Sequence, residues 1–210
     1  MKQKIRVLVV DDHAMMRLGL AEAIAEERHF QLVGEAANCA QAIESYRENH
    51  PDVVTMDFQL PGPDGADSTA QLRAAFPEAR IVIFSVSEGE EDIWRAVEAG
   101  VMGYVPKSAE VEEVIKAIQE VVAGKTYFPP AIAEKLAARR ERDSLTPREL
   151  QVLRLIVAGR SNKEIVSALH ISEAAVKLHI SNTLAKLNVE DRTQAAIAAV
   201  QRGIVRLAGN

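Results

Sequence analysis

Polar side chains follow several short apolar runs of this sequence, at the point where each run ends. Acidic residues follow the runs IRVLVV and VVTM, a serine follows IVIF, and a Pro-Lys pair follows GYV. If these runs are parallel strands of one sheet, their carboxyl ends meet at one edge, where open α/β sheets bind ligands. The residues that would meet there are Asp11, Asp12, Asp57, Ser85 and Lys107.

Such a group of side chains favours phosphoryl transfer to a carboxylate. Three carboxylates in one place repel one another, and a bound divalent cation relieves that repulsion. Magnesium prefers oxygen ligands and is commonly held by one or two carboxylates and a phosphoryl oxygen. Lys107 supplies a positive charge and Ser85 a hydrogen bond for the anion, so Asp57 is predicted to accept a phosphoryl group. A single acid at a strand end is more often a cap, so the prediction rests on the whole set.

Short apolar runs alternate with segments of helical spacing over the first 124 residues. The alternation predicts crossover units and a parallel sheet covered on both faces, that is, an α/β fold with a doubly wound five-stranded sheet. The predicted strands are residues 5–10, 31–35, 53–56, 81–84 and 103–105. The first, third, fourth and fifth of these strands lead into the polar residues described above.

The chain changes character after residue 124. Residues 125–143 are predicted to be a linker with one short helix, because two adjacent prolines interrupt the earlier pattern. Residues 144–210 show helical patterns alone and begin with SLTPRE, which has the composition of a capping box. Helices expected at residues 162–169 and 173–186 have the proportions of a helix-turn-helix.

The longer helix of this pair has one apolar face and one mixed face. The residues predicted to be buried are Val176, Ile180, Leu184 and Leu187. On the other face lie Leu178 and Asn182, and Lys177 lies on the flank; these side-chain types can contact a thymine methyl group, adenine and guanine, respectively. The predicted phosphate contacts, which position a protein without reading sequence, are Arg160, Lys163 and Lys186. The pattern equally fits an ordinary amphipathic helix in a small bundle, so both interpretations stay open.

The net charge of −5 is unevenly distributed along the chain. Residues 1–142 hold 16 basic and 24 acidic side chains, whereas residues 143–210 hold 9 basic and 6 acidic ones. This asymmetry suggests two domains with different partners. The single cysteine excludes an internal disulfide, and no apolar run reaches the ~20 residues of a membrane span. The first apolar run is too short for a signal peptide, so a soluble, cytoplasmic protein without a membrane partner is expected.

The first 124 residues resemble the receiver domains of two-component response regulators, which have a flavodoxin-like fold. The resemblance is carried by VVDDH at 9–13, MDFQLPGPDG at 56–65, FSVS at 84–87 and GYVPK at 103–107. It implies that Asp57 is the phosphoacceptor and that the Gln59 carbonyl joins the three acids around Mg²⁺. It further implies that Ser85 and Tyr104 form a conformational switch. Val86 and Ser108 depart from the small residue and the proline that many receivers have there.

Residues 143–206 resemble LuxR-type DNA-binding domains. The motifs are LTPRELQVLRLIVAGRSNKEI and LHISEAAVKLHISNTLAKLNVEDRTQA, and together with the first resemblance they indicate a NarL/FixJ-type response regulator. The family implies base contacts by Lys177, Leu178 and Ser181 and dimerisation through the last helix. The implied partners are a sensor histidine kinase, double-stranded DNA and, on activation, a second copy of the chain; RNA polymerase is a further candidate. Ala175 replaces the usual threonine.

Two alternative functions are set beside this interpretation. A phosphohydrolase could use Asp57 as a covalent nucleophile, but such sites often need a second acid two residues later, and Gln59 stands there. A regulator that binds DNA constitutively is the other alternative, and the complete set of acids with Lys107 argues against it. A nucleotide-binding module is disfavoured because no GxGxxG follows the first strand. The expectation is a regulator and not an enzyme.

Overall fold

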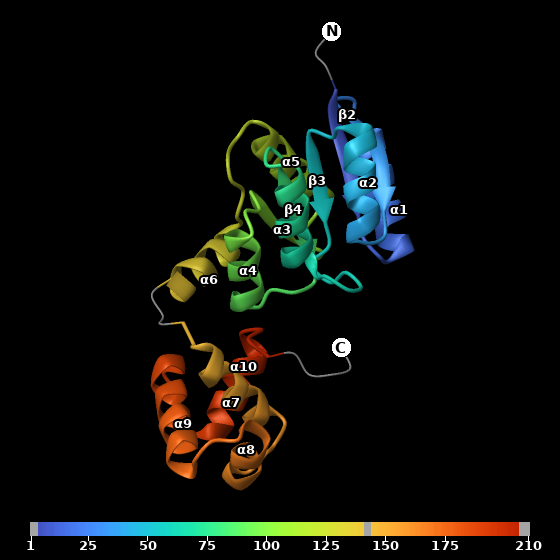
Figure 1. Cartoon of the computed structure of the whole chain (residues 1–210). Coiled ribbons are helices and arrows are strands. Elements are labelled where there is room, and N and C mark those ends of the chain that lie inside the picture. The colour runs from blue at the N-terminus through green and yellow to red at the C-terminus, as the bar shows by residue number, and fades with distance from the viewer. Residues whose placement is uncertain (1–3, 141–143, 206–210) are drawn as a thin grey trace. The chain divides into compact units, whose positions relative to one another are not determined.

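The computed structural model describes residues 4–140 and 144–205 of the chain. Contacts between Cα atoms divide it into two compact units, and the main change from one unit to the other falls between Glu134 and Lys135. The first unit contains a sheet and the second is helical (Figure 1). Each unit is described below by itself.

The first unit is built on a sheet of five parallel strands. Its strands are β1 (Ile5–Val10), β2 (Phe30–Ala36), β3 (Val53–Met56), β4 (Ile81–Ser85) and β5 (Gly103–Pro106). They lie in the order β2-β1-β3-β4-β5, so the chain winds in two directions from β1. The predicted α/β fold with a five-stranded doubly wound sheet is confirmed. Strands β4 and β5 each run one residue further than predicted, and β2 begins at Phe30.

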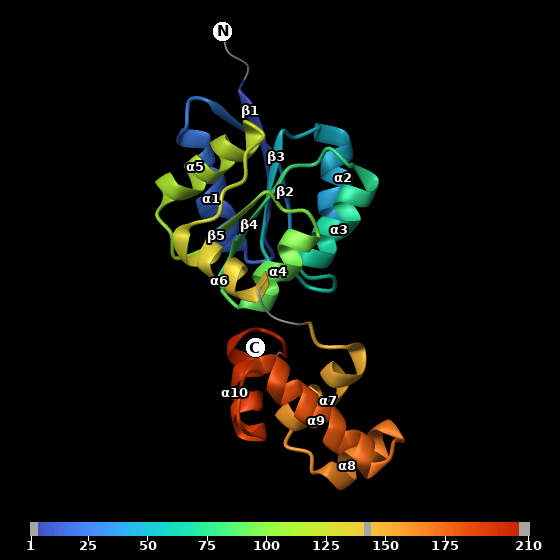
Figure 2. The same ribbon diagram turned by 90° about the vertical axis from the view of Figure 1, so that its left-hand side faces the viewer.

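Five helices connect and follow the strands. They are α1 (Ala14–Glu26), α2 (Cys39–Asn49), α3 (Gly65–Ala75), α4 (Glu90–Glu98) and α5 (Val111–Val122). Figure 2 shows α1 and α5 on one side of the sheet and α2 and α3 on the other. Strand residues are therefore buried on both faces, as expected for parallel strands: all four residues of β3 are buried.

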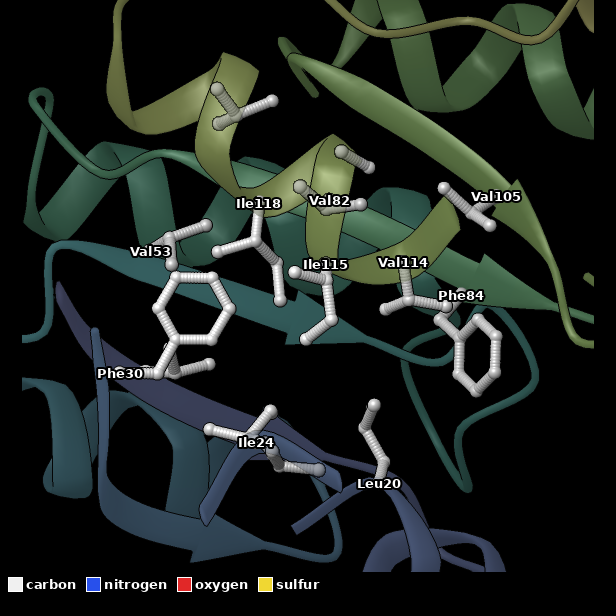
Figure 3. Packing of buried hydrophobic residues seen from close by; sticks show 14 residues of the cluster. Leu20, Ile24, Phe30, Val53, Val82, Phe84, Val105, Val114, Ile115 and Ile118 are labelled. Carbon is white, nitrogen blue, oxygen red and sulfur yellow. The ribbon is translucent and has the colours of Figure 1, made fainter. Parts of the chain in front are cut away.

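One hydrophobic core of the first unit lies between the sheet and the helices α1 and α5. Ile24 of α1 and Ile118 of α5 pack with the valines of four strands, and Phe30 closes one end of the cluster (Figure 3). This core contains only apolar side chains, whereas the polar side chains of the first unit described below lie at the carboxyl ends of the strands. The core therefore holds the strands rigidly, and the functional groups extend from their ends.

The segment after α5 adds one residue to the edge of the sheet. Tyr127 forms a parallel bridge with Gly103: its N–H donates to the Met102 carbonyl at 2.8 Å, and its carbonyl accepts from the Tyr104 N–H at 3.1 Å. Strand β5 is the last strand in the sheet order, so this bridge covers part of an edge that would otherwise be unpaired.

The second unit contains helices alone among its described residues. The predicted short helix is present as α6 (Pro130–Arg140), which begins in the first unit and ends in the second, and four helices follow it. These are α7 (Pro147–Val157), α8 (Asn162–Leu169), α9 (Glu173–Leu187) and α10 (Arg192–Gln201). Thr146 and Glu149 form the predicted capping box at the start of α7. His170 ends α8 in the left-handed region, and Ser172 caps α9. Three residues thus join α8 to α9, so the helix-turn-helix is present.

The buried face of α9 differs from the prediction at its centre. Val176 and Leu187 are buried as predicted, whereas Ile180 and Leu184 are half-buried. Thr183 is also buried, which the apolar pattern does not reveal because threonine carries a hydroxyl. That hydroxyl donates a hydrogen bond to the His179 carbonyl at 2.7 Å, so it is buried without an unsatisfied polar atom.

No helix in the part of the chain that the structure describes is both long and apolar enough to cross a bilayer.

Candidate functional site

The ends of β1, β3 and β5 bring two carboxylates and one ammonium group into contact. Lys107 Nζ lies 2.6 Å from Asp11 Oδ2 and 2.7 Å from Asp57 Oδ2. Asp11 is 3% exposed and Asp57 2% exposed, so both carboxylates are removed from bulk water. Ion pairs in such surroundings are screened little by salt. Lys107 is therefore held as the counter-ion of two buried acids.

The electrostatics of Lys107 follow from this position. Burial lowers the pKa of its ammonium group, but the hydrogen bonds to Asp11 and Asp57 outweigh burial and raise the pKa above its usual value. The side chain consequently stays charged throughout the physiological pH range. A fixed positive charge at the base of the site suits an anion such as a phosphoryl group.

The Asp57 carboxylate is also held from its own strand end. The backbone N–H of Gln59 donates to Asp57 Oδ1 at 3.0 Å, while Oδ2 accepts from Lys107. Both oxygens are thus oriented before any ligand binds, which lowers the cost of ordering them in a reaction.

The loop after Asp57 folds back tightly onto it. A side chain at Gly65 would place its Cβ 2.6 Å from Phe58 Cα and 2.7 Å from the Asp57 carbonyl oxygen, so only glycine fits there. The Gly65 N–H donates to the Phe58 carbonyl at 2.7 Å and closes the loop. Asp64 then caps α3 by accepting from the N–H groups of Ala66 and Asp67.

Four side chains at the site offer atoms that could hold a metal ion. Atoms of Asp11, Asp12, His13 and Asp57 all lie within 4.8 Å of one another. Three of the four are carboxylates, the donors that hard divalent cations prefer, and Asp12 is the more exposed of the neighbouring pair. The donor set therefore fits a divalent cation. His13 is the member that sequence reasoning missed.

The two residues expected to act as a switch are linked through a third. Ser85 and Tyr104 are fully buried. The Tyr104 hydroxyl donates to the Ser87 carbonyl, and the Ser87 N–H donates to Ser85 Oγ at 3.0 Å. Ser87 was not singled out from the sequence, because its contribution comes from the backbone and its residue type gives no signal. Val86, between the two serines, is 64% exposed.

Helix α4 is joined to the loop after Asp57 by an arginine. Arg95 Nη1 lies 2.7 Å from Asp64 Oδ2, and Arg95 Nη2 lies 3.1 Å from Asp67 Oδ1. Sequence reasoning missed Arg95 because an arginine on an amphipathic helix is ordinarily a solvated residue. The contact ties Asp64, which caps α3, to helix α4, which follows Ser85 and Ser87 in the chain.

The outward face of α9 carries the residues predicted to meet DNA bases. Lys177, Leu178, Ser181 and Asn182 are all exposed, and Leu178 is 59% exposed although it is apolar. Lys177 forms an ion pair with Glu173 one turn earlier, at 2.9 Å. Such a pair on a helix surface contributes only ~0.3–0.5 kcal/mol, so Lys177 is available to another partner. Lys163 is exposed on α8.

Lys186, a predicted phosphate contact, is engaged inside its own unit. Its Nζ lies 2.8 Å from Glu149 Oε2 and donates to the Ser144 carbonyl at 3.1 Å. Burial raises the pKa of Glu149, but the hydrogen bonds from Lys186 and Thr146 outweigh it and lower that pKa overall. Lys186 thus connects the end of α9 to the start of α7.

Comparisons with known proteins cover both units. The family described as the response regulator receiver domain matches residues 7–119. The family described as bacterial regulatory proteins of the luxR family matches residues 143–199. The two matches together include every residue of both sites described above.

Individual relatives match nearly the whole chain. The response regulator protein VraR of Staphylococcus aureus is 35% identical over 207 residues, which is 96% of this chain and 99% of VraR. The crystal structure of ChrA, a response regulator of a heme-sensing two-component system, is 34% identical with a TM-score of 0.57, over 96% of this chain and 99% of ChrA.

A more distant structure shares the fold. RcsB of Salmonella enterica serovar Typhimurium, bound to a promoter in the presence of the phosphomimetic BeF₃⁻, has a TM-score of 0.75 at 21% identity. The match covers 96% of this chain and all of RcsB.

Proposed function

Since this chain belongs to the two-component response regulators that join a receiver domain to a LuxR-type DNA-binding domain, we propose that phosphorylation of Asp57 controls its binding to DNA. The observation that carries the proposal is the Asp57 carboxylate, which is buried yet oriented by Lys107 and the Gln59 N–H at the carboxyl edge of the sheet. Such positioning of the acceptor, together with positive charge beside it, is the main requirement of phosphoryl transfer.

The transfer forms one bond and breaks one. An Asp57 carboxylate oxygen attacks the phosphorus of a phosphohistidine in a sensor kinase, and the phosphorus–nitrogen bond breaks with its electron pair leaving on the imidazole. Lys107 keeps its positive charge beside the phosphoryl oxygens as the negative charge shifts onto the acceptor. The hydroxyl of Ser85, at the end of the neighbouring strand, donates a hydrogen bond to the same oxygens.

Mg²⁺ is the proposed cofactor. Asp11, Asp12 and Asp57 would hold it together with the Gln59 carbonyl, and it would neutralise charge on the transferring group. Helix α1 begins directly beyond these acids and exposes Met15 and Leu18. An exposed apolar surface beside the acceptor is suited to docking of the kinase.

The signal would leave the site through the Ser85–Ser87–Tyr104 connection. Movement of Ser85 toward the phosphoryl group removes or redirects its hydrogen bond with the Ser87 N–H. Since the Ser87 carbonyl accepts from Tyr104, the loop and the tyrosine shift together. Altered surfaces of the first unit then favour a homodimer, and two DNA-binding units in one dimer bind two half-sites with a large gain in avidity.

Helix α9 is proposed to enter the major groove. Lys177 and Asn182 can donate to base edges, and Leu178 can contact a thymine methyl group. Ser181, a short side chain on the same face, is a further base contact, and Lys163 holds a phosphate. Lys186 is left out of the proposed contacts, because Glu149 and Ser144 already engage its ammonium group. RNA polymerase remains a candidate partner of the DNA-bound dimer in the cytoplasm.

Intact mass measurement tests the acceptor. The full chain is incubated with acetyl phosphate, with and without Mg²⁺, beside Asp57→Asn and the matched control Asp67→Asn, an exposed acid of the same unit. One phosphoryl addition is expected in the wild type and the control, only with Mg²⁺, and none in Asp57→Asn. Addition to Asp57→Asn, or none to the wild type, would contradict the proposal.

Fluorescence anisotropy with a set of promoter fragments tests the output. Phosphorylated wild type is expected to bind specific DNA at least ten times more tightly than Asp57→Asn. Equal affinity of the two would favour constitutive DNA binding. Repeated turnover of a small phosphate ester would favour the phosphohydrolase, whereas Gln59 in place of a second acid predicts slow loss of a single phosphoryl group.

A further inference from the structure

His13 stands between the acidic pair and helix α1 and does not act as a helix cap. It occupies the N-cap position of α1, but its side chain accepts no hydrogen bond from the helix. Instead, His13 Nδ1 lies 2.9 Å from Asp12 Oδ1 and 3.6 Å from Asp11 Oδ1. The imidazole is 65% exposed and thus open to a ligand from solvent. Its position is set by the acids and not by the helix.

These separations suit a shared coordination sphere. Two ligand atoms each ~2.1 Å from an octahedral cation lie about 3 Å apart when adjacent and about 4.2 Å apart when opposite. The 2.9 Å distance from Nδ1 to Asp12 Oδ1 is of the adjacent kind, whereas the 3.6 Å distance to Asp11 Oδ1 lies between the two values; all four side chains offer atoms within 4.8 Å of one another. An imidazole nitrogen can therefore enter the same sphere as the carboxylates without a change of backbone.

A nitrogen ligand changes which cation the site prefers. Mg²⁺ takes oxygen ligands and keeps several waters, so an imidazole adds little to its binding. Imidazole suits the later divalent transition metals, whose affinity for mixed nitrogen and oxygen sites rises along the first row. We propose that His13 is a ligand of the cation site and gives it a preference for divalent transition metals over Mg²⁺. This inference rests on the proposed function, because it assumes that the acids of the phosphorylation site bind a cation.

Calorimetric titration of the unphosphorylated full chain with Co²⁺ alone and with Mg²⁺ alone, at fixed pH, tests the inference. His13→Gln is expected to weaken Co²⁺ binding about ten-fold or more, by loss of one ligand, and to change Mg²⁺ affinity less than two-fold. His29→Gln, an exposed histidine of the same unit, is the matched control and should bind both metals as the wild type does. In NMR spectra of the Co²⁺-loaded chain, a paramagnetically shifted imidazole signal should be present in the wild type and in His29→Gln, and absent in His13→Gln.

Two outcomes would overturn the inference. Unchanged Co²⁺ affinity in His13→Gln, or a missing shifted signal in the wild type, would show that the imidazole stays outside the coordination sphere. An equal loss of Mg²⁺ and Co²⁺ affinity would show that His13 acts only by orienting Asp12. Failure of the proposed function looks different: Asp12→Asn would then bind Mg²⁺ as the wild type does, and Asp57 would take no phosphoryl group.

Discussion

At the scale of single residues, Lys107 is the group on which the charge balance of the site depends. Lys107→Met leaves Asp11 and Asp57 buried without their counter-ion. Removing one partner of a buried ion pair costs ~3–5 kcal/mol, so the free energy of unfolding is expected to fall by about 3 kcal/mol without a divalent cation. Urea unfolding followed by the fluorescence of Trp94 measures this change, since Trp94 is the single tryptophan and belongs to the first unit.

Added Mg²⁺ should then stabilise Lys107→Met more than it stabilises the wild type, because the cation replaces the missing charge. Lys125→Met is the matched control: Lys125 is an exposed lysine paired with Glu120, and its loss should change stability by no more than ~0.5 kcal/mol. Equal losses in the two variants would contradict the view that Lys107 neutralises the acids.

The residues that form the site could be predicted as a set because each lies at the carboxyl end of a strand. Asp11, Asp57 and Lys107 are separated by about fifty residues from one to the next, yet parallel strands deliver them to the same edge. Ser87 could not be found in this way, since it acts through backbone atoms. His13 was visible in VVDDH, but only the structure shows its imidazole beside the acids.

At the scale of elements, Asp64 connects the start of α3 with α4. Asp64→Ala removes the side chain that accepts from the Ala66 and Asp67 N–H groups and also removes one ion-pair partner of Arg95. Loss of a helix cap costs ~1 kcal/mol, so chemical denaturation should show a loss of about 1–2 kcal/mol. Asp67→Ala removes only an exposed contact with Arg95 and should cost ~0.5 kcal/mol or less. If the two substitutions prove equally harmful, the cap is not what stabilises this junction.

The start of α7 predicts a dependence on pH. Because the pKa of Glu149 is lowered in the folded chain, the ionised form contributes stability above its ordinary pKa of 4.5, and this contribution is lost as pH falls through the lower folded value. Glu149→Gln should therefore be about 1–3 kcal/mol less stable than the wild type at pH 7, with the difference shrinking as the pH falls below 4.5. Amide hydrogen exchange in α7, followed in both proteins as a function of pH, measures this difference in stability. A difference that stays constant with pH would assign the loss to packing instead.

Helices and strands were largely predictable because their patterns are local. The capping box at Thr146 and the three-residue turn at residues 170–172 each depend on residues close together in the sequence, and the structure contains both. Contacts between elements were not predictable, since the Lys186–Glu149 pair joins positions 37 residues apart and the Arg95–Asp64 pair joins positions 31 apart. Each of these residues, taken alone, has the type of an ordinary solvated side chain.

At the scale of the whole molecule, the distribution of charge determines how strongly DNA binding depends on salt. Residues 1–142 have a net negative charge and residues 143–210 a small net positive charge. Only a few lysine and arginine side chains of the second region are therefore expected to contribute to DNA binding. Lys163→Ala should weaken binding to all DNA sequences alike and reduce the slope of log K against log salt by about 1. Lys116→Ala, on α5 of the receiver, should leave the slope unchanged. A change of sequence preference in Lys163→Ala would instead assign this residue to base recognition.

The division into two units, with the first built from α/β crossovers and the second from helices, was predictable because the pattern of apolar residues changes along the chain. The arrangement of the sheet followed from the order of strands and connections. The bridge at Tyr127 did not, because a single residue that pairs with a strand has no repeating pattern of its own.

That bridge has a consequence for how the receiver can be isolated. Truncation at residue 124 removes Tyr127 and leaves the Met102 carbonyl and the Tyr104 N–H without their partners on the outer side of β5. An uncovered strand of this kind is a template for another chain, so a 1–124 fragment should associate into oligomers and precipitate as its concentration rises. A fragment that ends at residue 134 keeps the bridge and should remain monomeric. Tyr127 would then protect the edge of the sheet from association with other chains.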